Sequence, residues 1–246
     1  MIKLTAIVKR VPTKKALLIG INTFKFLDNR LYGCINDTEN MKDLLIRTFD
    51  FGKNNIHNLT DALATRNTIL KEIQWLIRDV EKGDILVLHC SSYGTKIFKE
   101  DEVICCYDMD WKSVKKDEGG KRGHIIVKDD LAPLMKKIEG GVKVEVFFDV
   151  CFSGTNPPTL SEQQIQKKRP IIGRYLTPPK YYSGGTEVGR RDEEDPSTSL
   201  GSLTWFGAKK GGQTGFEAFL GGKYNGVFTY NFCQDVRSVR GKIIVF

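Results

Sequence analysis

The sequence predicts an α/β fold of three layers, in which a mostly parallel central sheet carries helices on both faces. Short, continuously apolar runs alternate with segments of helical periodicity along the first 150 residues. Two of these runs, at 84–90 and 142–150, pass directly into polar loops. Because functional loops gather at the carboxyl ends of parallel strands, we expect the loops 91–95 and 151–154 to be neighbours.

The composition is that of an ordinary globular protein. The 246 residues are 40% hydrophobic and 28% charged. The net charge of +8 permits acidic partners, but bases and acids are mixed along the chain, so nucleic-acid binding is not expected. Six cysteines show neither a CxxC pair nor zinc spacing. With no evident signal peptide or membrane-spanning run, we expect no membrane contact and a reducing, cytoplasmic setting.

The N-terminal half contains three apolar runs and two amphipathic segments. Asn36 or Asp37 is the predicted cap of the first helix, and Thr65 or Asn67 that of the second. The predicted elements are strands at 16–21, 55–60 and 84–90, with helices after the first two.

The C-terminal half begins with a strand of period two that starts at Val142 and ends at Cys151. Residues 156–200 are rich in proline, glycine and charge, which predicts a long, mobile surface loop. The other predicted elements are paired strands at 102–107 and 124–127, a helix at 129–138, a strand at 202–208, a helix at 226–239 and an apolar tail at 242–246.

Cys151 ends the central strand and is followed by a Ser-Gly turn. A strand end directs its side chain out of the sheet, and loop amides gather around it, which suits a nucleophile. A buried structural cysteine is the alternative, and on this stretch alone it is the favoured one.

Five motifs, in chain order, resemble those of the caspase and metacaspase group of cysteine peptidases (peptidase C14), especially the bacterial, orthocaspase-like members. They are KKALLIGIN, GCINDTENM, LVLHCSSYGTK, FFDVCFSG and GGKYNGVFTYNF, all between residues 14 and 237. The resemblance implies a caspase-hemoglobinase-like fold and a Cys–His dyad. It places the nucleophile at Cys151 and the oxyanion hole at the backbone amides of Cys151 and Gly94.

The resemblance places Tyr93 where the family has its catalytic histidine. A phenol with a pKa near 10 is a poor general base and forms no cation beside a thiolate. Phe152, at a position where the family usually has histidine, makes the surroundings more apolar and further disfavours a thiolate. His89 lies four residues before Tyr93, about 13 Å along a strand, so we do not expect it to substitute.

The resemblance also implies a pocket for a basic side chain, formed by Asp37, Asp149 and Ser91. Two convergent carboxylates favour arginine or lysine through charge-assisted hydrogen bonds. A helix cap at Asp37 and a strand-end acid at Asp149 are the alternatives, and we favour the pocket. The family often has a further acid before the glutamine of a nearby loop, where this chain has Gly212 before Gln213.

Calcium-binding relatives imply a metal site at Asp108, Asp129 and Asp130, with Pro158 at a fourth ligand position. Calcium takes six to eight oxygen ligands, so we favour solvent-exposed helix-cap acids over a weak Ca²⁺ site. No cofactor is otherwise expected.

These residues predict a pseudopeptidase that binds a protein or peptide with exposed arginine or lysine. An active or weakly active endopeptidase that cleaves after Arg or Lys is one alternative, with Arg174, Arg190 and Arg191 as candidate sites of self-cleavage. A structural assembly module is the other. We expect an N-terminal extension at 1–13 and one domain at 14–246, with a shorter C-terminus than in relatives; a fragment, a shortened form and a module of a longer protein remain open.

Overall fold

The structure, a computed structural model, describes residues 10–98, 101–114, 123–138, 140–153, 169–181, 203–207 and 215–239. Most of the predicted extension at 1–13 and the whole apolar tail at 242–246 lie outside these residues.

A parallel sheet of five strands forms the middle layer, in the order β2-β1-β3-β7-β9. Every neighbouring pair in it is parallel. The strands are β1 (Lys14–Gly20), β2 (Ile56–Thr60), β3 (Ile85–Ser91), β7 (Lys143–Asp149) and β9 (Leu203–Gly207). The predicted strands of the central sheet are confirmed. The apolar runs of β1, β3 and β7 are buried on both faces of the sheet.

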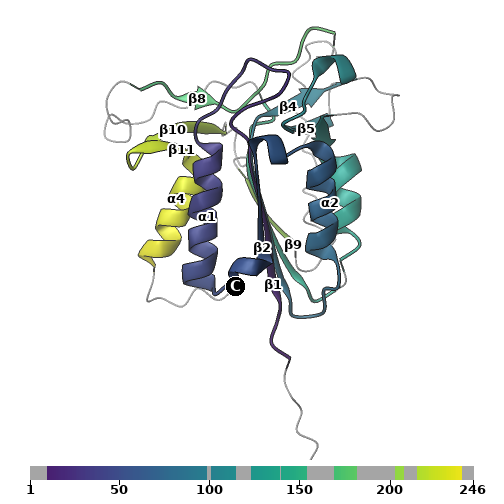
Figure 1. Cartoon of the computed structure of the whole chain (residues 1–246), viewed down its shortest axis with the longest axis vertical. Coiled ribbons are helices and arrows are strands. Elements are labelled where there is room, and N and C mark those ends of the chain that lie inside the picture. The colour runs from purple at the N-terminus through teal and green to yellow at the C-terminus, as the bar shows by residue number, and fades with distance from the viewer. Residues whose placement is uncertain are drawn as a thin grey trace, which may run out of the picture.

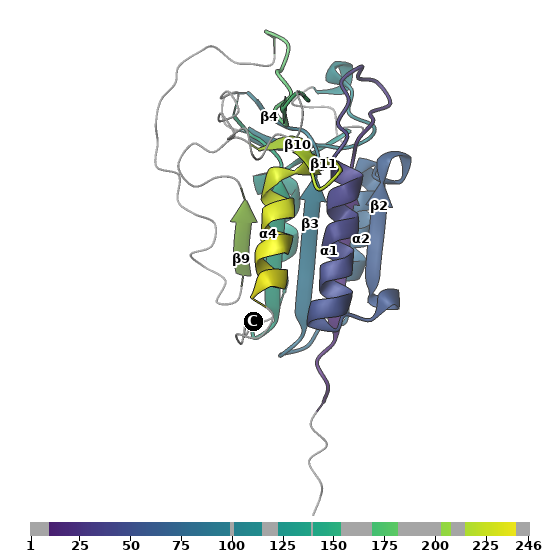
Figure 2. The same ribbon diagram turned by 90° about the vertical axis from the view of Figure 1, so that its left-hand side faces the viewer.

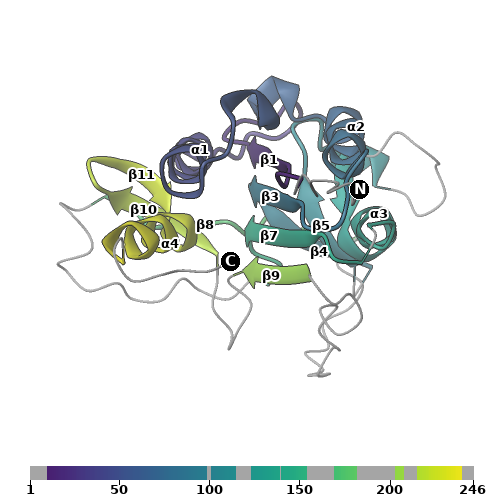
Figure 3. The ribbon, with the colours of Figure 1, turned by 90° about the horizontal axis from the view of Figure 1, so that it is seen from below.

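Helices cover both faces of this sheet, as predicted (Figures 1 and 3). On one face lie α1 (Cys34–Phe49) and α4 (Val227–Ser238), side by side in Figure 2, and on the other lie α2 (Arg66–Ile77) and α3 (Ala132–Met135). Side chains of β1 alternate between the two apolar layers: Leu17 and Ile19 face α2, while Ala16 and Leu18 face α1. The three-layer α/β fold is therefore confirmed. No helix among the described residues is both long and apolar enough to cross a bilayer.

The helix ends differ in part from the prediction. Thr65 caps α2 by accepting a hydrogen bond from the Thr68 amide, as predicted. Gly33 occupies the N-cap of α1 without a side-chain bond, so the predicted cap at Asn36 or Asp37 is wrong. The helix predicted at 129–138 is instead a π-helical turn, η4 (Val127–Leu131), followed by the single turn of α3. Single 3₁₀ turns are η1 (Lys53–Asn55), η2 (Asp61–Leu63) and η3 (Trp111–Ser113).

Two small antiparallel sheets lie beyond the carboxyl ends of the central strands (Figure 1). One contains β4 (Gly94–Ile97), β5 (Asp101–Cys105) and β6 (His124–Ile126); the pairing of β5 with β6 was predicted and is confirmed. The other contains β8 (Ile172–Gly173), β10 (Phe216–Leu220) and β11 (Lys223–Gly226).

The mobile surface loop predicted at 156–200 needs a correction for residues 169–181. Here β8 pairs with β10, and the side chain of Arg174 is completely buried. Backbone pairing and ion pairs over long sequence distances, described below, outweigh the polar local composition. The rest of that stretch, with Arg190 and Arg191, lies outside the described residues.

Candidate functional site

Three predicted pocket residues meet where the central strands end. Ser91 and Asp149 are register partners at the last positions of β3 and β7. The first turn of α1 brings Asp37 to them, and the Ser91 hydroxyl donates to Asp37 Oδ2 at 2.7 Å. Gly20 permits this approach of α1, since a Cβ there would lie 2.9 Å from the Cys34 carbonyl carbon. All three polar side chains are fully buried.

The chain's own Arg174 fills this pocket. Its guanidinium forms ion pairs with Asp37 at 2.8 Å, with Asp149 at 2.8 Å and with Glu217 at 3.3 Å. It also donates to Ser91 Oγ at 2.7 Å and to the Asp149 carbonyl at 3.0 Å. The pocket is therefore complementary to an arginine side chain, with acceptors on both terminal nitrogens.

Glu217 is a pocket residue that the sequence analysis missed. Besides Arg174, it accepts hydrogen bonds from the backbone amides of Tyr32 at 2.8 Å and Gly33 at 2.9 Å. Its carboxylate thus links β10 to the loop that precedes α1. The sequence signal that could have identified it is a lone acid within the otherwise apolar run 216–220. An acid that is buried with such a run needs a charged or hydrogen-bonding partner.

The carboxylates of Asp37 and Asp149 are also held by the start of α4. Asp37 accepts from the Gly226 amide at 2.8 Å, and Asp149 Oδ2 accepts from the Thr229 amide at 3.0 Å and hydroxyl at 2.7 Å. A Cβ at Gly226 would lie 2.7 Å from Asp37 Oδ2, so only glycine fits there without displacement. Backbone and hydroxyl donors therefore fix both acids toward the pocket.

His89 is a structural histidine within this network. Its Nε2 lies 3.1 Å from Thr229 Oγ1, whose proton is already donated to Asp149. The imidazole must therefore be the donor, which places a proton on Nε2. Burial lowers the pKa of His89 to about 4, so it is neutral at pH 7. That His89 does not serve Cys151 stays a prediction.

Burial and like charge raise the pKa of Asp37. Three carboxylates share one guanidinium in the pocket, an excess of two negative charges if all are ionised. Burial raises the pKa of Asp37 to about 6; Arg174 opposes this increase, and Asp149 adds to it. Burial alone would lower the pKa of Arg174, but the surrounding carboxylates raise it well above its usual value, and the guanidinium stays charged.

This shift predicts a pH-dependent stability that Asp37→Asn should remove. A group whose pKa is higher in the folded than in the unfolded chain stabilises the fold below its unfolded pKa, near 4. That contribution is lost as the pH rises from about 4 through the folded value of about 6. We therefore expect the melting temperature of the wild type, relative to that of Asp37→Asn, to fall as the pH rises over this range. A constant difference from pH 4 to 7 would contradict the assignment.

The backbone around Arg174 lies between β10 and Gly94 and is hydrogen-bonded to both. The Arg174 amide donates to the Gly215 carbonyl at 2.9 Å, and Gly173 and Ile172 pair antiparallel with β10. On the other side, the Gly94 amide donates to the Arg174 carbonyl at 2.8 Å, and the Leu176 amide donates to the Gly94 carbonyl at 2.8 Å. The amide predicted for an oxyanion hole therefore binds the carbonyl of the pocket arginine.

Cys151 lies directly beside Gly94, so the two loops expected to be neighbours are in contact. A Cβ at Gly94 would lie 2.8 Å from the Cys151 carbonyl carbon and 3.1 Å from its nitrogen. The sulfhydryl of Cys151 donates to the Ser153 carbonyl at 2.9 Å. Among the residues described, its hydrogen-bond contacts are with Ser153 alone.

Tyr93 has separate partners. Its ring packs on Phe24, with centroids 5.4 Å apart, and its hydroxyl donates to the Arg30 carbonyl at 3.3 Å. Burial is the main cause that raises the pKa of Tyr93 to about 12, which leaves the phenol protonated at neutral pH. The geometry provides no proton acceptor at this position.

Two of the three acids considered as candidate calcium ligands have partners within the protein. Asp108 accepts from the Arg66 amide at 2.9 Å, and Asp130 forms an ion pair with Arg66 at 2.6 Å. Within the described ranges, no group of three or more His, Cys, Asp or Glu residues is placed to hold a metal, Asp129 included. Pro158 and the Gly212–Gln213 pair lie outside these ranges. The weak Ca²⁺ site stays the less favoured alternative.

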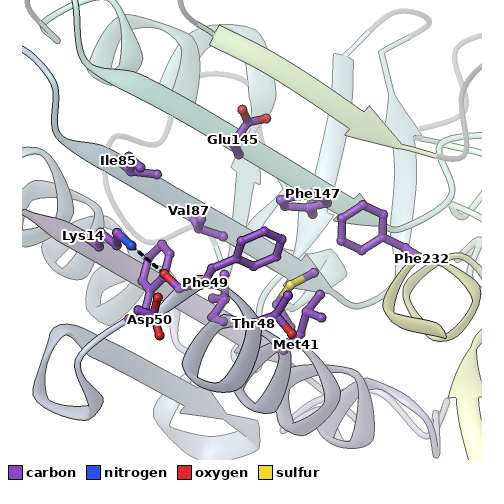
Figure 4. Close-up of a pocket in the computed structure, with 13 residues that line it drawn as sticks. Lys14, Met41, Thr48, Phe49, Asp50, Ile85, Val87, Glu145, Phe147 and Phe232 are labelled. Atoms are coloured by element: carbon purple, nitrogen blue, oxygen red, sulfur yellow. Dashed lines mark hydrogen bonds between the residues drawn. The ribbon is translucent and has the colours of Figure 1, made fainter. Parts of the chain in front are cut away.

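A separate apolar cavity of about 230 Å³ lies between α1, α4 and the sheet (Figure 4). Phe49, Phe147 and Phe232 contribute rings to it, and Glu145 reaches it from β7. At one end Lys14 donates to the Phe49 carbonyl at 2.6 Å. None of the lining residues belongs to the acidic pocket, and the cavity adds nothing to the site.

Comparisons with known proteins agree with this arrangement of motifs. Metacaspase-1A of Neurospora crassa is 26% identical over 266 residues, covering 92% of this chain and 56% of that protein. Metacaspase-1 of Meyerozyma guilliermondii is 36% identical over 157 residues, covering 58% of this chain and 35% of that protein. The chain thus spans about half or less of the length of these curated relatives.

A solved structure of pro-sf-caspase-1 matches 94% of this chain and 72% of its own, with 14% identity and a TM-score of 0.47. The sequence profile of the family described as "Metacaspase, peptidase C14 domain" matches residues 14–158, more than half of the chain. That range includes the strands that end in Ser91 and Asp149 and the loop that carries Cys151. The chain therefore belongs to the metacaspase family of C14 peptidases.

Proposed function

We propose that this chain is a metacaspase-type pseudopeptidase, whose acidic pocket binds an arginine or lysine side chain of a protein segment while its peptidase chemistry is impaired. In this proposal Tyr93 occupies the family's catalytic histidine position, and Cys151 keeps the nucleophile position. The relationship to bacterial, orthocaspase-like members and a cytoplasmic setting are parts of the proposal. All six cysteines are free thiols, which supports a reducing compartment.

One observation carries the proposal: Tyr93 and Cys151 have separate hydrogen-bond partners. The phenol is bonded to the Arg30 carbonyl, and the sulfhydryl is bonded to the Ser153 carbonyl. A cysteine peptidase needs a base that accepts the thiol proton and later returns a proton to the leaving amine. A phenol with a pKa near 12 cannot accept that proton at neutral pH.

The pocket supports the ligand class. Three buried carboxylates and one hydroxyl surround the guanidinium of Arg174, so a neutral or acidic side chain would leave these acids without a counter-charge. Lysine would satisfy the charge but not the two-nitrogen geometry, and we expect it to bind more weakly than arginine.

A working endopeptidase that cleaves after Arg or Lys is the second candidate, and one contact favours it. The Arg174 carbonyl already accepts a hydrogen bond from the Gly94 amide at 2.8 Å, beside Cys151. This is the position of the reacting carbonyl if Gly94 contributes to an oxyanion hole.

Turnover by the wild type and by Cys151→Ala distinguishes the two functions. We expect equal, background rates for both on Arg- and Lys-terminated fluorogenic peptides, with and without calcium. Because Arg174 already occupies the pocket, cleavage of the chain after Arg174 requires no peptide from solution, so mass spectrometry of the incubated protein gives a second readout. Turnover or self-cleavage that Cys151→Ala abolishes would show a working peptidase instead.

A further inference from the structure

We infer that the acidic pocket and its surroundings select extended peptides with two basic side chains five residues apart, one bound in the pocket and one upstream on an aromatic shelf formed by Tyr32, Phe219 and Tyr224. The chain's own residues 169–176, RPIIGRYL, are the present occupant and are called the resident segment. The inference rests on the proposed arginine-binding function and adds a second contact to it.

Within the shelf, the ring face of Phe219 contacts Arg169. The guanidinium carbon of Arg169 lies 3.9 Å from the centroid of the Phe219 ring, which is close enough for a cation–π contact. Tyr224 meets Phe219 edge to face at 5.7 Å and packs against Tyr32 at 5.5 Å. These contacts fix the orientation of Phe219 toward the passing segment.

The shelf also binds the backbone of the segment. The Tyr224 hydroxyl donates to the Pro170 carbonyl at 3.3 Å. Together with the bond from the Arg174 amide to the Gly215 carbonyl, this contact anchors the segment at both ends of β8. The peptide is therefore held extended between the two arginine sites.

One strand sets the spacing between the sites. Glu217 and Phe219 are two residues apart on β10, so their side chains lie on the same side of the strand. Glu217 contacts Arg174, and Phe219 contacts Arg169. Because the segment runs antiparallel to β10, the cation that reaches Phe219 must lie upstream of the pocket arginine. In the resident segment this cation is Arg169, five residues before Arg174.

The two sites should differ in strength. The pocket buries its guanidinium completely among charged partners, whereas Arg169 is exposed to solvent. Cation–π contacts at exposed positions are weak, so we expect the shelf to change affinity by about 2- to 5-fold. The pocket decides whether a peptide binds, and the shelf discriminates among peptides that do.

Binding of labelled peptides to the Arg174→Ala chain tests the inference directly, because that chain lacks the pocket anchor of the resident segment. The probe is fluorescein-RPIIGRYL, measured by fluorescence anisotropy. Citrulline, which has nearly the shape of arginine without the charge, replaces the first or the sixth residue of the peptide. We expect citrulline at the sixth position to abolish measurable binding and at the first to weaken it about 2- to 5-fold.

Variants of the shelf give the matched controls. In a Phe219→Leu background the first-position effect should disappear, because leucine keeps the apolar contact but has no ring face; Phe219→Tyr should retain it. Equal affinity for arginine and citrulline at the first position would overturn the shelf and leave the pocket intact. Equal affinity for peptides with arginine and with citrulline at the sixth position, or no binding by any peptide, would overturn both the arginine pocket and the shelf.

A second measurement uses the intact chain, since Arg174→Ala is expected to be less stable. The amides of Arg174 and Leu176 exchange with solvent only when the segment leaves its partners. Arg169→Gln and Phe219→Leu should each speed their exchange about 2- to 5-fold, and the double variant should add nothing further. Unchanged exchange, or additive effects, would overturn the shelf. Lys53→Gln, far from the segment in sequence, controls for net charge.

Discussion

Replacing Arg174 with alanine should lower the free energy of unfolding by about 3–5 kcal/mol, because it leaves buried charges without their partner. The guanidinium is the counter-charge of Asp37, Asp149 and Glu217, all of which have no side-chain exposure. Chemical denaturation at pH 7.5 measures the loss. Arg169→Ala, in the same segment but exposed, should cost less than about 1 kcal/mol and is the matched control.

The loss in Arg174→Ala should also depend on pH. Arg174 holds down the pKa of Asp37, which is nonetheless raised to about 6, so removing the guanidinium should raise that pKa further. A group with a raised folded pKa destabilises the fold most when it is ionised. The loss should therefore be largest at pH 7.5 and smaller near pH 4.5. A loss below about 1 kcal/mol, or one that is equal at both pH values, would show that the cluster is not held by its ion pairs.

Tyr93→His should give the chain the proton acceptor it lacks and lead to self-cleavage after Arg174. General acid–base help is worth a factor on the order of 10²–10⁴ in rate. The Cys151 sulfur would bond to the Arg174 carbonyl carbon, and the bond to the Tyr175 nitrogen would break as that nitrogen takes a proton. Water would then hydrolyse the thioester. Mass spectrometry should detect fragments 1–174 and 175–246.

Two variants separate this chemistry from a change of structure. Tyr93→Phe removes the hydroxyl bonded to Arg30 without adding a base, and we expect it to stay intact. The double variant Tyr93→His, Cys151→Ala should also stay intact, because the nucleophile is gone. An intact Tyr93→His chain after long incubation would mean that residue 93 does not stand where a base can serve Cys151.

The central sheet and part of the site were predictable because their signals are local. The strands β1, β3 and β7 are short apolar runs, so the proximity of the loops that follow β3 and β7 was expected from the strand pattern. The pocket residues Ser91 and Asp149 were implied by the family resemblance. Thr65 likewise caps α2 through a residue three positions away. These signals lie within one element or between adjacent strands, although the misplaced cap of α1 and the missing helix at 129–138 show that local patterns do not fix every element.

The occupant of the pocket was not predictable from such patterns. Arg174 lies in a polar, proline-containing stretch, and its partners Asp37 and Glu217 are 137 and 43 residues away. Composition there indicates a surface loop, and no periodicity marks an arginine for burial. The third carboxylate, on β10, gives only the weak signal of one acid between apolar residues. Contacts of this range depend on how distant segments meet in the folded chain, which local residue patterns do not specify.

The long sequence separations within the acidic cluster bear on how the chain folds. Its members come from β3, β7, β10, the residue after β8 and the first turns of α1 and α4, so no subset that is contiguous in sequence can complete it. Loop-closure entropy opposes such distant meetings until the intervening strands have paired. The cluster is therefore among the last parts of the molecule to form. Before the cluster forms, its carboxylates are solvated and can pair with cations other than Arg174.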